Sequence, residues 1–140
     1  MNLYDYIQTI ESARRNTISA VETEKALEKP ILPPERMVEL YNTFLACHKR
    51  HSTKSEDDIQ TRRIFILIAF RLTSPRVLVG YKLNRGIRGR IADVIGCEPS
   101  LVSHSFKNLV FQYKRYKTFR ALVDDIYADV LNEMDIARFV

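Results

Sequence analysis

Glycine, cysteine and tryptophan are scarce in this sequence of 140 residues, which contains four glycines, two cysteines and no tryptophan. There is no Asn-Gly or Asp-Gly pair and no sustained alternation of apolar and polar residues, so signals for β-strands and hairpins are nearly absent. Cys47 and Cys97 lie far apart and form no CxxC pair. A disulfide framework or a four-cysteine zinc site is therefore not expected, and we predict two reduced, buried thiols.

Long apolar runs are also absent. The longest uncharged run, residues 64–70, is far shorter than the roughly 20 residues that a membrane span needs. The first residues lack the basic-then-apolar pattern of an export signal, so we expect a cytoplasmic protein without a membrane partner. With 46% hydrophobic and 28% charged residues, the composition is typical of a folded globular protein, and the length fits a single domain over 1–140.

Acidic residues are scarce in the middle of the chain. Residues 61–120 contain thirteen Lys or Arg and only two acidic residues, Asp93 and Glu98, although the formal net charge of the whole chain is only +5. The remaining residues are accordingly acidic on balance. Such segregation of charge indicates a surface that contacts the phosphates of a nucleic acid.

The apolar residues recur mostly at three- and four-residue steps, which predicts an all-α protein, a compact bundle of six or seven helices that contains a helix-turn-helix. Proline and capping residues mark several helix starts, with Ser55 or Asp57 expected to cap the most hydrophobic helix at the centre of the core. The expected helices cover residues 2–28, 33–51, 57–71, 75–84, 89–95, 99–111 and 114–137. We divide the domain into a helical part over 1–54, a basic part over 55–120 and an acidic last helix over 121–140.

The segment 91–106 has the residues that two helices need when they cross steeply through a tight turn. Ala92 leaves room where the helices touch, and Gly96 can adopt a positive backbone angle without steric cost. Glu98 and Pro99 start the second helix. A small shared core is expected beneath the turn, formed by Ile91, Ile95, Cys97 and Val102.

This pattern resembles the phage repressor type of helix-turn-helix, in which an aliphatic-alanine pair is followed four residues later by glycine and six residues after that by an aliphatic residue. Ser105 stands where that family usually has an aliphatic side chain, and we expect Phe106 to take over its packing role. Residues 62–72, an arginine-led aliphatic helix, are more loosely similar to the DNA-binding domain of the bacterial replication initiator. The first resemblance covers some twenty residues and the second about fifty.

The resemblance implies that the chain binds double-stranded DNA through residues 99–111. The side chains expected to reach base edges are those of Glu98, Ser100, Ser103, His104 and Lys107. The start of this helix has no Arg, Asn or Gln for bidentate base contacts, so part of the specificity is expected to come from DNA shape. Seven cations that bracket the motif are expected to contact phosphates, namely Arg85, Arg88, Arg90, Lys114, Arg115, Lys117 and Arg120.

We therefore predict a small transcriptional regulator that is not an enzyme, takes no cofactor or small-molecule substrate and forms a homodimer through its first and last helices. A replication or partition accessory protein is the alternative within the DNA-binding class, and an adaptor for RNA or another protein is the alternative outside it. Aromatic residues interleaved with the cations are expected to pack in the core rather than stack on bases, namely Phe106, Phe111, Tyr113, Tyr116 and Phe119. Cys47, His48 and His51 supply too few ligands for a predicted metal site, and His104 lacks the partners of a catalytic base.

Overall fold

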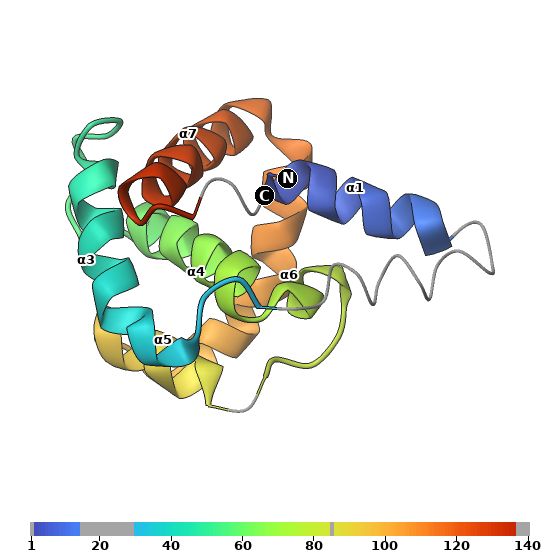
Figure 1. Cartoon of the computed structure of the whole chain (residues 1–140), viewed down its shortest axis with the longest axis horizontal. Helices are drawn as coiled ribbons and strands as arrows, with labels where there is room; N and C mark the ends of the chain where they lie inside the picture. The colour runs from blue at the N-terminus through green and yellow to red at the C-terminus, as the bar shows by residue number, and fades with distance from the viewer. Residues whose placement is uncertain (1, 15–29, 85, 137–140) are drawn as a thin grey trace.

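A single apolar helix, α4 (Ile59–Thr73), lies at the centre of the computed structural model, which describes residues 2–14, 30–84 and 86–136 (Figure 1). Every side chain from Ile64 to Thr73 is buried. The prediction that this helix forms the middle of the core is confirmed. Its cap is Asp58 and not Ser55 or Asp57, because the Asp58 side chain accepts a hydrogen bond from the Gln60 amide at 2.8 Å.

The predicted all-α class is confirmed over the described residues, which contain six α-helices and two short 3-10 helices and no strand. Around α4 are packed the other elements, namely α1 (Leu3–Arg14), η1 (Pro34–Arg36), α3 (Met37–His48), η2 (Pro75–Val79), α5 (Ile87–Ile95), α6 (Pro99–Arg115) and α7 (Lys117–Glu133). Residues 15–29 of the first predicted helix lie outside the described residues.

Several predicted boundaries are wrong. The helix expected over 75–84 is only the 3-10 helix η2, because Gly80 follows it with φ +99° and ends the helical turn. The helix expected to end at residue 111 continues to Arg115, since no glycine or proline interrupts it, and α7 starts after a single extended residue, Tyr116.

The first and last helices cover the core of the chain itself. One apolar face of α1 is buried through Leu3, Tyr6, Ile7 and Ile10. The stripe of α7 is buried through Val123, Ile126, Tyr127, Val130 and Leu131. Both faces belong to one hydrophobic cluster with α4, so they are not free for a second copy. The homodimer stays a prediction.

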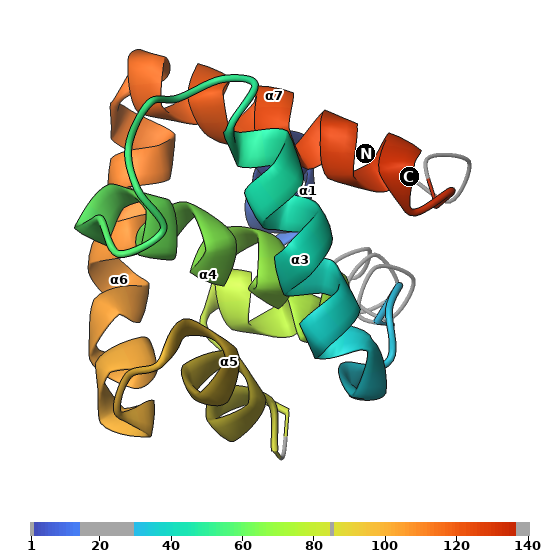
Figure 2. The same cartoon turned by 90° about the vertical axis from the view of Figure 1, so that its left-hand side faces the viewer.

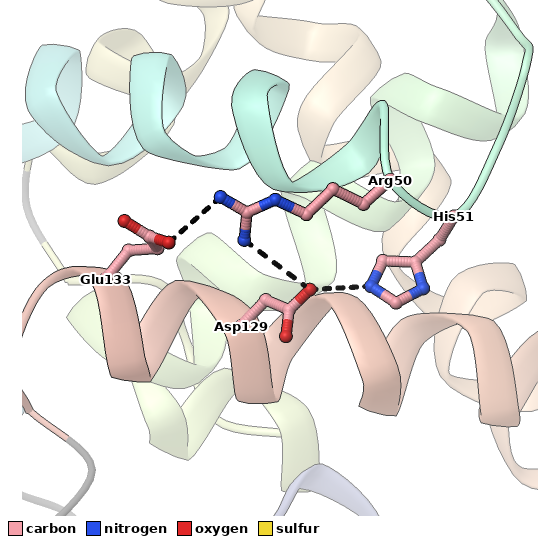
Figure 3. Close-up of polar contacts among 4 residues, drawn as sticks. All are labelled: Arg50, His51, Asp129 and Glu133. Carbon is pink, nitrogen blue, oxygen red and sulfur yellow. Dashed lines mark hydrogen bonds and ion pairs between the residues drawn. The ribbon is translucent and has the colours of Figure 1, made fainter.

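Two acidic residues of α7, Asp129 and Glu133, contact Arg50 and His51, which follow the end of α3 (Figure 3). Arg50 Nη2 lies 2.9 Å from Glu133 Oε1, and its Nη1 lies 3.9 Å from Asp129 Oδ2. His51 Nε2 lies 2.6 Å from the same Asp129 oxygen. These groups are partly exposed, so each pair contributes little to stability, but together they join the loop after α3 to α7.

We expect His48 to make the fold sensitive to mild acid. Its ring is buried, its Nε2 lies 3.2 Å from Thr61 Oγ1, and burial lowers the pKa of the imidazole below its usual value. A base with a lowered pKa in the folded state contributes full stability above its unfolded pKa of about 6.5, and that stability is lost as the pH falls toward the folded pKa. We expect the urea midpoint to fall between about pH 6.5 and pH 5, above the range where most carboxylates titrate.

The control for this prediction is His48→Gln, which keeps a polar side chain but removes the protonation. Its urea midpoint is expected to vary less than that of the wild type over the same pH range. An equal pH dependence in both proteins would show that other groups cause it.

Candidate nucleic-acid interface

Helices α5 and α6 form the corner that the sequence pattern predicted, here called the α5–α6 corner (Ile87–Arg115). In Figure 2, α5 is seen nearly end-on while α6 runs along the edge of the molecule, so the two helices cross steeply. Gly96 ends α5 with φ +71° and ψ +41°, a left-handed conformation that favours glycine. The Cys97 amide then donates a hydrogen bond to the Ala92 carbonyl at 3.0 Å, which closes the turn.

Most of the apolar side chains expected beneath this corner are buried, but the prediction of a buried Cys97 thiol is wrong. Ile91 and Val102 are fully buried, Ala92 is 1% exposed, and Ile95 is nearly buried, whereas Cys97 is only half-buried. Ala92 is thus enclosed in the core of the corner, where a larger side chain would overpack it. This small core fixes the direction in which α6 leaves the turn.

Phe106 takes the packing role that Ser105 cannot fill. The Phe106 ring packs edge to face against Phe70 of α4, with ring centroids 6.0 Å apart. The Ser105 hydroxyl donates a hydrogen bond to the Leu101 carbonyl at 2.8 Å, so it is satisfied within its own helix. The predicted packing of Phe106 is therefore confirmed.

The residues predicted to reach base edges are all exposed in the first half of α6 or at its cap, namely Glu98, Ser100, Ser103, His104 and Lys107. A helix turns by about 100° per residue, so Ser100, His104 and Lys107 lie along one ridge. Val102, Leu109 and Tyr113 face the opposite way and are buried. The exposed ridge is thus a surface that no other described element covers, polar from Ser100 to Lys107 and apolar at Phe111.

Sequence reasoning missed three exposed residues on or beside this ridge. Asn108 is exposed one turn after His104, and its amide has the donor and acceptor that pair with adenine in the major groove. Leu101 and Phe111 are also exposed, at 48% and 58%. Asn108 lies four residues after His104, so helical periodicity alone places it on the same side of α6. The prediction missed it because it followed the ridge only through the first two turns of the helix.

Three of the predicted phosphate-contacting cations are exposed beside or beyond this ridge, and a fourth is partly engaged. Arg88 is exposed, and its Nη1 donates a hydrogen bond to Ser103 Oγ at 3.3 Å across the corner. Arg115 and Lys117 are exposed at the other end of α6. Arg90 is exposed, but its guanidinium donates to the Pro34 carbonyl at 3.4 Å.

The other predicted cations are placed differently. Lys114 Nζ pairs with Glu11 Oε1 at 2.6 Å and so connects α6 to α1. Arg120 lies over the Tyr4 ring, 3.9 Å from its centroid, and donates to the carbonyl oxygens of Tyr113 and Lys114. Both cations are used to hold helices together. Arg85 lies outside the described residues.

The aromatic residues around α6 divide into two groups. Tyr113 is buried, burial raises the pKa of its hydroxyl, and that hydroxyl donates to Asp124 Oδ1 at 2.5 Å. Phe106 and Phe119 are half-buried and pack against the core. Phe111 and Tyr116, in contrast, are more than half exposed and contact each other edge to face, with centroids 6.5 Å apart. The expectation of core packing is thus wrong for these last two residues, because Phe111 lies on the exposed face of α6, opposite Leu109 and Tyr113, and Tyr116 is the extended residue between α6 and α7.

The remaining candidate groups have other contacts. Cys47 and His48 are buried, and His51 pairs with Asp129. Within the described ranges, no three His, Cys, Asp or Glu side chains gather closely enough to hold a metal ion. None of the described helices combines the length and apolarity required to cross a bilayer.

The exposed ridge of α6 is therefore the strongest functional candidate among the described residues. It combines hydrogen-bonding side chains with flanking cations on an element that is anchored at both ends. Comparison of the chain with protein-family models, with curated proteins and with solved structures finds no match.

Proposed function

We propose that this chain is a small transcriptional regulator that binds double-stranded DNA through a helix-turn-helix, with the first half of α6 in the major groove. The observation that carries the proposal is the exposure of all five predicted base-contacting side chains at the start of one helix, next to Arg88. A helix of ordinary diameter fits the major groove, which is about 12 Å wide. Because α6 lies at the edge of the molecule, a duplex reaches it without displacing another described helix (Figure 2).

The chemistry of the ridge suits base recognition by a few directed contacts. Ser100 and Ser103 can donate or accept hydrogen bonds, Glu98 can accept from cytosine N4, and Asn108 can pair with adenine N6 and N7. The exposed Leu101 side chain can contact a thymine methyl group. The surrounding cations supply the larger, sequence-independent part of the affinity.

The proposal is tested by selecting bound duplexes from a random pool. We expect the wild type to enrich a common short sequence, and the triple variant Ser103→Ala/His104→Ala/Asn108→Ala to bind DNA without that preference. Each base contact that is lost should reduce discrimination by about 1–3 kcal/mol, or about 5- to 150-fold. The matched control is Asn132→Ala, an exposed position on α7 that should leave the enriched sequence unchanged.

The alternatives give different results in the same assay. Enrichment of no sequence, with tight binding of single-stranded RNA instead, would favour stacking on Phe111 and Tyr116 and would contradict the proposal. Binding to no nucleic acid would favour a protein-binding adaptor. A replication or partition role would give the same enrichment, and the position of the enriched sequence in a genome would distinguish it from transcriptional regulation.

A further inference from the structure

Two grooves with cationic rims lie on either side of the exposed ridge of α6. The first has a volume of about 350 Å³ and lies between α4, the end of α5 and α6, with Arg62 and Arg63 on its α4 side. Its α6 wall is formed by Leu101 and Ser105. We call it the α4-side groove.

The second groove has a volume of about 410 Å³ and is lined by Lys82 and Arg88, by residues 83, 84 and 86 between them, and by Ser103 of α6. We call it the α5-side groove. Its α6 wall is Ser103, whose hydroxyl already accepts a hydrogen bond from Arg88. Neither Lys82 nor Arg88 forms an ion pair with any residue that the structure describes.

The two grooves face opposite sides of α6. Leu101 and Ser103 are two residues apart, so the helix turns by about 200° between the wall of one groove and the wall of the other. The ridge of Ser100, His104 and Lys107 lies between them. A helix in the major groove has one phosphate strand on each side, which is the arrangement that two cationic flanks match.

Arg62 and Arg63 have donors available for such a strand. Arg63 has no ion pair within the described ranges, and Arg62 Nη2 makes only a 3.6 Å contact with Asp57, whose side chain is 84% exposed. The Asp58 carboxylate is not expected to compete with a phosphate for these two guanidinium groups, because it caps α4 by accepting a hydrogen bond from the Gln60 amide.

We infer that the two grooves receive the two phosphate strands of one duplex, with Arg62 and Arg63 on one strand and Lys82 and Arg88 on the other. This inference rests on the proposed function and adds a second contact surface from α4. It also specifies the form of the ligand, since a duplex presents two phosphate strands at the fixed spacing of its major groove and a single strand presents only one backbone. Double-stranded nucleic acid with an open major groove is the only form that engages both flanks, which excludes duplex RNA because its major groove is too narrow.

The test uses two pairs of neutral replacements in the full chain, Arg62→Gln/Arg63→Gln and Lys82→Gln/Arg88→Gln. For a DNA duplex of about 20 base pairs, we plot the logarithm of the association constant against the logarithm of the salt concentration. Each pair of replacements should make the negative slope shallower by about 1.8, because each lost phosphate contact removes about 0.9. The two effects should add in the quadruple variant. For a single strand separated from that duplex, the effects of the two pairs of replacements should not add, since both pairs of cations compete for the same backbone.

Two further variants guard against a purely structural effect. Lys49→Gln removes an exposed cation at the end of α3, away from both grooves, and should leave the slope unchanged. Asp57→Asn removes the carboxylate beside Arg62 and should strengthen duplex binding. Circular dichroism and thermal melting check that each variant is folded.

The outcomes separate the inference from the proposed function. A normal slope in Arg62→Gln/Arg63→Gln, with a reduced slope in Lys82→Gln/Arg88→Gln, overturns the inference and leaves the proposed function standing; the α4-side groove would then be open to an acidic peptide. Failure of the wild type to bind duplex DNA overturns both. Equal and additive losses on the duplex alone support the inference.

Discussion

Raising the salt concentration from about 50 to 200 mM is expected to weaken duplex binding by about a thousandfold, the largest effect that we expect of any change in conditions. The estimate assumes about six phosphate contacts, as from Arg62, Arg63, Lys82, Arg88, Lys107 and Arg115 if each contacts one phosphate. Neutralising a phosphate releases condensed counterions, so the affinity falls as the bulk salt rises. Fluorescence anisotropy over this range should give a log–log slope of about −5.

The control for the salt effect is a variant that loses as much positive charge as Arg62→Gln/Arg63→Gln, but at a site elsewhere on the molecule. Lys49→Glu changes the net charge by two units at a distance from α6, and it should keep the slope of the wild type. A wild-type slope shallower than about −2 would mean that no more than two cations contact phosphates. The grooves beside α6 would then not be the binding surface.

Replacing Ile91 with alanine is expected to lower the free energy of unfolding by about 2–5 kcal/mol. Ile91 is fully buried in the α5–α6 corner, so its loss removes apolar contacts and leaves a cavity in a part of the core that consists of few side chains. For a domain with a total stability of about 5–15 kcal/mol this is a large share. Urea denaturation monitored by circular dichroism measures the change.

Leu101→Ala is the matched control, because it shortens an aliphatic side chain in the same corner at a position that is 48% exposed. We expect its free energy of unfolding to stay within about 1 kcal/mol of the wild type, while its duplex affinity falls. A strongly destabilised Leu101→Ala would show that this side chain supports the corner, and that it is unavailable for DNA.

The elements that could be predicted from the sequence are those whose signal is local. The apolar run of α4 and the Ala92–Gly96 spacing of the corner depend on neighbouring residues, and the structure places both as expected. The exposure of Ser103 and His104 also follows from helical periodicity once the buried side of α6 is known.

The features that sequence reasoning misplaced depend on contacts between distant residues. Lys114 and Arg120 look like free cations in the sequence, but Lys114 meets Glu11, and Arg120 meets Tyr4, across most of the chain length. No pattern within a short window contains this information.

The joint between α6 and α7 affects the thermodynamics of any binding at α6. Only Tyr116 separates the two helices, and Arg120 binds the last carbonyls of α6 while it stacks on Tyr4 of α1. With the corner at one end and this joint at the other, α6 has little conformational freedom to lose when a ligand docks. The entropic cost of ordering the protein should therefore be small, and affinity should depend mainly on the fit of the ligand to a surface that is already formed.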